Sequence, residues 1–434
     1  MRSVTEALSI VLQHVRKGAV ESVSLTDEQN RCHVLNRCLA AELFATQDSP
    51  PFDKSLMDGF AVTAELRPAG RKGHGTLQPD AFPAEAEKSV VTLPVVETII
   101  AGRVPTATIH VGNAARIMTG APLPPGCDCV VPMEQTQFDE RSPGIVRIPL
   151  SAIRPEANLI RKGTAARAGS RLLASGVRIQ PQHIAAMAEF GFGVVTIHKT
   201  PTVAVLATGD ELIAFDQPLQ PGRIRNSNEP MLLAQVAASH ARSVSLGIAR
   251  DDKEELLAKI EQGLQQDVLL LSGGVSAGLM DLVPMQLARA GVQEIFHGVN
   301  MKPGKPVWFG KREIHDRTCL VFGLPGNPVS SLVCFELFVR PALNQLSGCS
   351  NPTHELSAVL AESISIKGNR PTYQPTAFSV VEGRLTATPV PWSGSSDLRA
   401  TVEANGMVLL DPDHGEYSVG QSVAAWLWGD GRFN

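Results

Sequence analysis

The stretch TVAVLATGDEL, residues 202–212, decides how the second half of the chain is interpreted. An apolar run leads directly into a polar loop, which is typical of a buried strand that ends at the edge of a sheet. Apolar strands and amphipathic helices then alternate along the chain. Strands are expected at 202–208, 243–249, 267–274 and 319–326, and helices at 229–240, 252–266, 281–291 and 330–343. Helices between strands favour parallel pairing, so the pattern predicts an open α/β sheet.

The regions on either side have a different texture. Short β-rich runs separated by glycine and proline occupy 90–134 and the part after Gly348, which indicates a small β domain and a C-terminal β barrel or sandwich. The first 45 residues are expected to be helical, with an apolar stripe that begins at Val4 and Leu8. A further helix is expected at 181–191, and 67–90 is interpreted as a loop.

Composition excludes several functional classes. The chain has 434 residues, and its 39 basic and 43 acidic side chains give a net charge of −4. The chain therefore lacks the basic excess typical of proteins that bind nucleic acid or anionic membranes. No apolar run reaches the roughly 18 residues of a spanning helix. Seven cysteines without a regular framework fit a reducing cytoplasm, and the pair Cys127 and Cys129 lacks further metal ligands.

Three loops after the predicted strands combine glycine with hydroxyl or amide side chains. In an open α/β sheet, ligands bind beyond the carboxyl ends of the strands, where backbone N–H groups approach a phosphate or another oxyanion. One such loop alone often only closes the chain, but three in one sheet favour a binding site. The residues concerned are Thr208, Gly209 and Asp210, then Ser272, Gly273, Gly274 and Ser276, and finally Gly326, Asn327 and Ser330.

Carboxylates in the same loops are candidates for holding a hard divalent cation. Glu211 follows the first strand, Asp281 precedes a helix, and Asp251 lies before another helix. The alternative is that Glu211 and Asp281 only place charge at helix N-termini, and Asp252 is interpreted as an N-cap.

The segment MKPGKPVWFG, residues 301–310, sets Lys302 and Lys305 each before a proline, with Gly304 between them. A stiffened turn of this kind suits an anion held between two ammonium groups, although a solvated charge pair is the alternative. Far upstream, Asp58 and Thr119 with Gly120 lie in compact loops of the β region rather than in the α/β sheet.

These segments identify a family resemblance. PFDKSLMDGFAV, RIMTGAPLPPGCDCVV, TGDEL, SGGVSAGLMD, KPGKP and GLPGNPVSS follow the order seen in the molybdopterin molybdenumtransferases, or molybdenum insertases, which include the gephyrin E domain. The resemblance covers essentially the whole chain. It implies that adenylylated molybdopterin and molybdate react to give molybdenum cofactor and AMP, with Mg²⁺ or another divalent cation.

The resemblance also implies an architecture and partners. It predicts an elongated homodimer whose site is shared between subunits, and contact with a molybdopterin adenylyltransferase and with apo-molybdoenzymes. Four domains are expected within the subunit. They are a discontinuous mixed N-terminal domain (1–50 and 146–180), an inserted small β domain (51–145), a three-layer α/β molybdopterin-binding domain (181–346) and a C-terminal β barrel (347–434).

The resemblance also implies roles for individual residues, according to their positions in the shared motifs. Lys302, Lys305 and Pro306 resemble the molybdate-binding turn, and Ser330 completes that pocket together with Arg370 and either Ser393 or Ser395. Glu211 and Asp281 resemble the side that holds the metal and the nucleotide phosphates, while Asp58 resembles an acid linked to catalysis.

Two segments depart from the family pattern. Members usually carry an acidic pair where this chain has Thr164 and Ala165, and an aspartate where it has Asn226. Asparagine keeps an acceptor oxygen without the charge, and alanine keeps neither. One interpretation is an active insertase with drift at supporting positions. The alternative is a catalytically weakened paralogue that binds cofactor or partner proteins. A nucleotide-binding phosphotransferase would leave KPGKP unexplained and lacks the G-x-x-x-x-G-K-[ST] motif.

Overall fold

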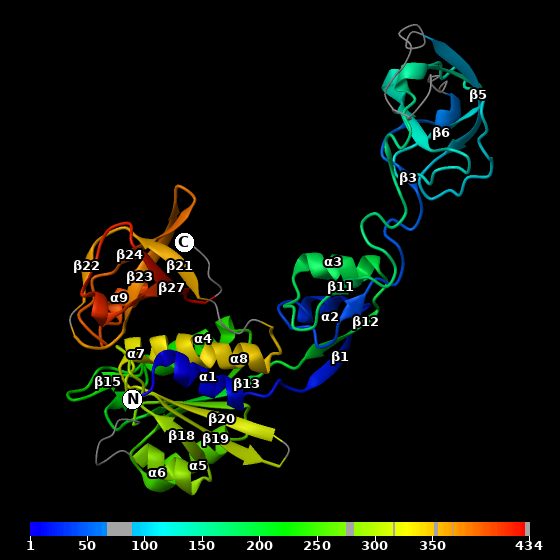
Figure 1. Ribbon diagram of the computed structural model, residues 1–434. Coiled ribbons are helices and arrows are strands. Elements are labelled where there is room, and N and C mark those ends of the chain that lie inside the picture. Colours follow the sequence, from blue (N-terminus) through cyan, green and yellow to red (C-terminus); the bar gives the residue numbers. More distant parts are fainter. Residues whose placement is uncertain (67–88, 275–281, 316, 351–354, 367, 430–434) are drawn as a thin grey trace. The chain divides into compact units, whose positions relative to one another are not determined.

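A computed structural model describes residues 1–66, 89–274, 282–315, 317–350, 355–366 and 368–429 (Figure 1). The chain forms two compact units. The first comprises 1–41, 174–185 and 192–434, and the second comprises 42–173 and 186–191. The predicted loop at 67–90 lies almost entirely outside the described residues.

A six-stranded sheet organises the first unit, with the order β16-β13-β17-β20-β19-β18. The first four strands in this order are parallel, and the last two pairs are antiparallel. The predicted α/β sheet is therefore confirmed, but it is mixed rather than wholly parallel. Its strands are β13 (Thr202–Thr208), β16 (Arg242–Ala249), β17 (Val268–Ser272), β18 (Gln293–His297), β19 (Trp308–Ile314) and β20 (Arg317–Leu324).

Helices cover both faces of this sheet, as Figure 1 shows. Alternate residues of β13, such as Val203 and Ala204, belong to separate cores, because successive strand side chains point to opposite faces. One core receives α1 (Val4–His14), α4 (Asn228–Ala238), α7 (Pro328–Cys334), the π-helical turn Phe335–Val339 and α8 (Arg340–Leu346). The other receives α5 (Lys253–Gly263) and α6 (Leu282–Arg289).

The C-terminal part of the first unit is a closed barrel, as predicted, with the order β21-β24-β23-β25-β27. Its core includes Phe378 and Val408. The elements are β21 (Leu356–Leu360), β22 (Ile364–Ser365), β23 (Thr372–Val381), β24 (Arg384–Pro389), α9 (Arg399–Glu403), β25 (Gly406–Leu410), β26 (Glu416–Tyr417) and β27 (Ser422–Leu427).

The expectation that the first 45 residues are helical is wrong after α1. The segment Val20–Ser24 is strand β1 and pairs antiparallel with β12 (Val194–His198), before the short helix α2 (Glu28–His33). Residues 20–24, VESVS, place their two valines three residues apart, so no period of two marks the strand, and it forms through backbone pairing with β12. The predicted helix at 181–191 is confirmed as α3 (Pro181–Glu189).

The second unit contains a six-stranded sheet, β7-β4-β6-β5-β9-β8, around a core that includes Phe60 and Ile148. Its strands are β4 (Gly59–Val62), β5 (Val90–Ile99), β6 (Ala114–Ile117), β7 (Cys129–Pro132), β8 (Gln137–Phe138) and β9 (Ile145–Pro149). Two strand pairs accompany it, β2 (Leu43–Phe44) with β11 (Arg171–Leu173) and β3 (Lys54–Ser55) with β10 (Leu159–Ile160). Among the described helices, none has the length and apolar character needed to cross a membrane.

Candidate functional site

The predicted glycine loops meet at the carboxyl ends of β13, β17 and β20. Asn228, in the first turn of α4, donates from Nδ2 to Ser272 Oγ and to the Gly326 carbonyl, and each distance is 2.7 Å. Its Oδ1 atom is buried and has no hydrogen-bond partner among the described residues. Asn228 therefore ties α4 to two of the three loops, a role that the sequence did not reveal because its partners are distant along the chain.

Glycine is required where the second loop crosses the first. A Cβ atom on Gly273 would lie 2.6 Å from the Thr208 carbonyl oxygen, and one on Gly274 would lie 3.0 Å from Thr208 Oγ1. Both glycines also have positive φ angles, 94° and 63°. The second loop therefore approaches the backbone of the first loop more closely than a side chain would allow.

Acidic side chains surround the end of β13. The Glu211 carboxylate folds over Gly209, where an added Cβ would lie 2.6 Å from Oε2. Asp210 Oδ1 accepts from the backbone N–H of Asp251 at 3.1 Å, and Arg250 Nη1 donates to the Asp210 carbonyl at 2.9 Å. This loop is thus joined to the one that precedes α5. Asp252 is the N-cap of α5, as predicted, and accepts from Glu254 N and Glu255 N.

The sequence-predicted metal and phosphate residues are only partly covered. Ser276 and Asp281 lie outside the described residues. Within the described ranges, no group of three His, Cys, Asp or Glu side chains is placed to hold a metal ion. Mg²⁺ commonly uses only one or two protein carboxylates and completes its shell with water and substrate phosphates, so Glu211 and Asp251 have the donor chemistry for it.

The lysine turn is held against the barrel segment on both sides of Lys302. Lys302 N donates to the Pro371 carbonyl at 2.8 Å, and Tyr373 N donates to the Lys302 carbonyl at 2.7 Å. Arg370 Nη1 donates to the Met301 carbonyl at 3.0 Å. These bonds bring Lys302 and Arg370 into one cluster, whereas Lys305 is exposed on the same turn.

The side chain of Lys302 has a defined neighbour. Its ammonium group lies 5.6 Å from the ring centroid of Trp392, within the range of a cation–π contact. Gly304 has a φ of 105°, and a Cβ there would lie 2.5 Å from the buried Cys334 sulfur. The turn is therefore fixed by close packing beneath it.

The two C-terminal serine candidates have different surroundings. Ser395 Oγ accepts from Asn327 Nδ2 at 2.7 Å, and its carbonyl accepts from Val329 N at 3.1 Å. Ser393 instead donates from Oγ to Asp397 Oδ2 at 2.9 Å. Ser395 thus lies against the loop that leads into α7, whose first turn contains the buried Ser330.

In the second unit, Asp58 and Thr119 form a local pair. Asp58 Oδ1 accepts from Thr119 Oγ1 at 2.6 Å and from Thr119 N at 2.7 Å. These bonds lower the pKa of the Asp58 carboxyl, the side-chain bond contributing most. Gly120, with a φ of 78°, donates its N–H to the Ser55 carbonyl at 2.9 Å. An exposed, ionised carboxylate is available here as a base or a hydrogen-bond acceptor.

Asn226, one of the departures, is paired with a neighbouring acid. Its Nδ2 donates to Glu229 Oε2 at 2.7 Å, and its Oδ1 accepts from Glu229 N at 3.2 Å. Glu229 Oε1 also accepts from Ser245 Oγ and from Gly247 N. A carboxylate is therefore present three residues after Asn226, within hydrogen-bonding distance of its side chain.

The other departure lies in a turn of the second unit. Thr164 Oγ1 donates to the Arg161 carbonyl at 2.6 Å, and Ala165 N donates to the Ser49 carbonyl at 2.9 Å. Asp48 lies close by and pairs with Lys162 at 3.6 Å. Neither Thr164 nor Ala165 offers an acidic group, but the turn itself is fully formed.

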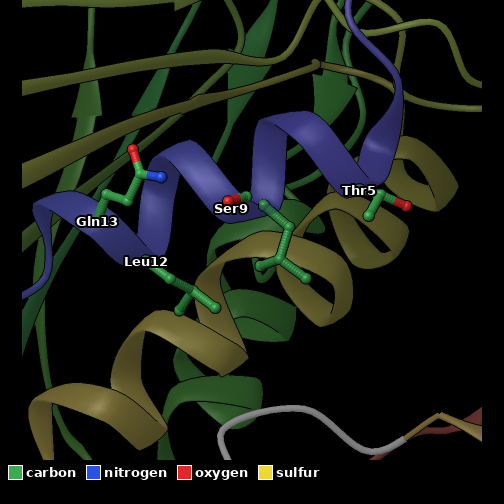
Figure 2. A pocket seen from close by; sticks show the side chains of 5 residues that line it. Thr5, Ser9, Leu12 and Gln13 are labelled. Atoms are coloured by element: carbon green, nitrogen blue, oxygen red, sulfur yellow. The ribbon is translucent and has the colours of Figure 1, made fainter.

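A groove of about 450 Å³ lies along α1 (Figure 2), and none of its lining residues belongs to the glycine loops or to the lysine turn. It is lined by uncharged side chains of one helix face, namely Thr5, Leu8, Ser9, Leu12 and Gln13. These five side chains include no cation suited to holding an oxyanion.

Three family profiles match the chain. They are described as MoeA N-terminal region (domain I and II), probable molybdopterin binding domain, and MoeA C-terminal region (domain IV), over 2–191, 204–345 and 357–428.

Similar proteins match along their whole lengths. A molybdopterin molybdenumtransferase of Bacillus subtilis is 33% identical and covers 98% of this chain and 93% of its own. Molybdopterin molybdenumtransferase 2 of Mycobacterium tuberculosis is 32% identical over 98% of this chain and 99% of its own. A crystal structure of a molybdopterin biosynthesis protein from Pyrococcus horikosii superposes with a TM-score of 0.76 at 28% identity and covers 98% of both chains.

Proposed function

The chain belongs to the molybdopterin molybdenumtransferase family, and we propose that it inserts molybdenum from molybdate into adenylylated molybdopterin with release of AMP. The observation that carries this proposal is the convergence of Lys302, Arg370 and Trp392 around the KPGKP turn. We infer that the enzyme works in the cytoplasm, where the thiols of a chain with seven cysteines remain reduced.

The lysine turn is suited to molybdate, a tetrahedral dianion. Lys302 and Lys305 supply full positive charges, and Pro306 fixes the backbone after them. Arg370 contributes a further cation from the barrel, and Ser395 and Ser330 offer hydroxyl groups from the neighbouring loop and helix. We favour Ser395 over Ser393 because Ser395 bonds to Asn327 in that loop. Charge alone would not distinguish molybdate from sulfate, so we infer that pocket size provides selectivity.

The glycine loops are suited to the phosphate groups of the adenylylated substrate. The loops at Thr208–Asp210, Ser272–Gly274 and Gly326–Asn327 place peptide groups and hydroxyls at one edge of the sheet. Asn228 holds two of these loops at a fixed separation. Such oriented dipoles stabilise charge that develops on an oxygen when the pyrophosphate bond breaks.

Glu211 and Asp251 are the described residues that would hold a divalent cation, with Asp281 as a further candidate by motif. Bound Mg²⁺ would neutralise charge on the two phosphates. We infer a homodimer in which Asp58 and Thr119 act at the site of the partner subunit. Asp58, kept ionised by its bonds to Thr119, would accept a proton or a hydrogen bond there.

The test is a single turnover of the purified chain. Protein loaded with adenylylated molybdopterin receives molybdate and Mg²⁺, and AMP release is followed together with reconstitution of an apo-molybdoenzyme. We expect both products from the wild type and neither from Lys302→Ala. The matched control is Lys311→Ala, which removes a lysine that pairs with Glu313 on strand β19. Equal loss in both variants would contradict a specific role for Lys302.

The second candidate function is a weakened paralogue that retains cofactor without inserting metal. The observation in its favour is the absence of acidic groups at Thr164, Ala165 and Asn226. Tight retention of the adenylylated ligand without AMP release would support it and would overturn the first proposal.

A further inference from the structure

Two cysteines far apart in sequence lie on opposite sides of the segment 176–178. Cys38 forms an antiparallel bridge with Arg178, and Leu39 exchanges backbone hydrogen bonds with Gly176 and Val177. On the other side, Ser350 N donates to the Gly176 carbonyl at 3.1 Å. Cys349, next to Ser350, is thereby held beside the same segment, just after the end of α8.

The guanidinium group of Arg178 connects the two sides. Its Nη2 donates to Cys349 Sγ and to Asn344 Oδ1, each at 3.0 Å, and its Nη1 donates to the Asn36 carbonyl at 2.7 Å. The Cys38 and Cys349 side chains lie close enough for each thiol to shift the pKa of the other. Cys38 is 1% exposed, whereas Cys349 is partly exposed. One sulfur is thus accessible to a small reagent, and the other lies behind it.

These contacts shift the pKa values of the two thiols in opposite directions. The hydrogen bond from the Cys38 thiol, assisted by the positive charge of Arg178, lowers the pKa of Cys349 to about 7. The same hydrogen bond and burial raise the pKa of Cys38. Thiolate is the reactive form of cysteine, so Cys349 is the attacking group. By contrast, burial raises the pKa of Cys129 and of Cys319 to about 12, which makes them unreactive.

We propose that Cys349 is a modification site for low-molecular-weight disulfides, such as glutathione disulfide, and that Cys38 resolves the adduct into an intramolecular disulfide. In the first step, the Cys349 thiolate attacks one sulfur of the reagent, its S–S bond breaks, and one thiolate leaves. In the second, Cys38 loses its proton to that leaving thiolate or to solvent and attacks the Cys349 sulfur, releasing the second thiol. The two cysteines are oxidised by two electrons, and one reagent disulfide is reduced to two thiols.

The second step is expected to outpace loss of the adduct. Cys38 pairs with Arg178 through the backbone and Cys349 accepts from the Arg178 side chain, so attack by Cys38 is intramolecular and benefits from a high effective concentration. The product would link the segment before Leu39 to the end of α8. Because the closed loop spans most of the chain, the oxidised protein should unfold at a higher temperature than the reduced protein.

The experiment treats the reduced full-length chain with glutathione disulfide and maps thiols and disulfides by mass spectrometry of non-reduced peptides. It uses the Cys32→Ser background, because Cys32 is exposed and would add an unrelated adduct. We expect a Cys38–Cys349 linked peptide, reversed by dithiothreitol, with a higher unfolding temperature. In Cys38→Ser, the reaction should stop at a glutathione adduct on Cys349. In Cys349→Ser, neither product should form.

Two further outcomes would overturn the proposal. One is a stable glutathione adduct on Cys349 in the presence of Cys38, because it would show that Cys38 does not resolve it. The other is a protein that remains fully reduced while a peptide cysteine in the same tube is oxidised. Circular dichroism of each serine variant verifies that a missing product does not reflect a failure to fold. Neither readout depends on molybdenum insertion.

Discussion

Replacing Asn226 with aspartate would restore the residue that family members usually carry, yet the structure predicts that this change alone is harmful. Asn226 is 3% exposed, and its Nδ2 lies 2.7 Å from Glu229 Oε2. Asn226→Asp removes that donor and places two carboxylates against each other. Glu229 cannot easily turn away, because Ser245 and Gly247 also donate to it.

The magnitude follows from the charge separation. Two like charges about 4 Å apart repel by about 4 kcal/mol at an effective dielectric constant near 20. Glu229 is half-buried, and solvent screening reduces this cost. We therefore expect Asn226→Asp to lower the free energy of unfolding by about 2 kcal/mol at pH 7.

The penalty should depend on pH in a defined direction. Repulsion between the two carboxylates favours a shared proton in the folded variant, so the native variant binds a proton more tightly than its unfolded chain. The loss of stability is then small near pH 4, where the folded pair holds a proton, and grows as the pH rises to 7. Calorimetry should show the unfolding temperature falling by about 4–8 °C relative to the wild type at pH 7 and much less at pH 4.

The matched control is the exchanged pair Asn226→Asp with Glu229→Gln. Glutamine at position 229 can donate through Nε2 to the carboxylate introduced at position 226, and it can accept from Ser245 and Gly247 through Oε1. The double variant should recover most of the lost stability, with a coupling energy of about 2 kcal/mol in the mutant cycle. Wild-type stability in Asn226→Asp alone, with no coupling to position 229, would refute the reasoning.

Three further predictions concern other parts of the chain. Glu336→Ala should cost about 3–5 kcal/mol of stability, measured by thermal unfolding, because Arg340 would be left as a buried, unpaired cation. Gly273→Ala should slow AMP release at least about tenfold, because its Cβ would push apart two loops of the site; Gly222→Ala, which has a similar positive φ but open space around it, is the control and should release AMP normally. Its bonds to Thr119 lower the pKa of Asp58, so this carboxyl should take up a proton at a lower pH than an ordinary aspartate; carboxyl titration by NMR measures this, and protonation at the ordinary aspartate pKa or above it would contradict the prediction.

The strands and helices of the α/β region could be predicted from the sequence because continuous apolar runs mark the buried strands and amphipathic periodicity marks the helices between them. Strand β13 agrees with its predicted bounds. The antiparallel strands β18 and β19 could not be predicted in this way, because no helix separates them and the prediction depends on strands that alternate with helices. No strand is predicted for VWFG, residues 307–310, whereas Trp308 begins β19.

The candidate site could be predicted where its chemistry is local. Glycine loops and the KPGKP turn can be recognised because adjacent residues determine the backbone conformation they need. Asn228 could not be found in this way, since its partners Ser272 and Gly326 become neighbours only in the folded sheet. Ser393 and Ser395 are likewise equivalent in sequence, and only the contact with Asn327 distinguishes them.

The departures at Asn226 and Ala165 have different physical meanings. Near Asn226 a negative charge is still present, because the Glu229 carboxylate accepts a hydrogen bond from the Asn226 side chain. At Ala165 the nearby carboxylate belongs to Asp48, which already accepts from Ala168 N and pairs with Lys162. A negative charge at position 226 would therefore face the carboxylate of Glu229, whereas one at position 165 would have the Asp48–Lys162 ion pair nearby. It follows that Ala165→Asp would add an acidic group to a turn of the second unit that already holds a cation, Lys162, whereas Asn226→Asp would add one against Glu229 in the first unit.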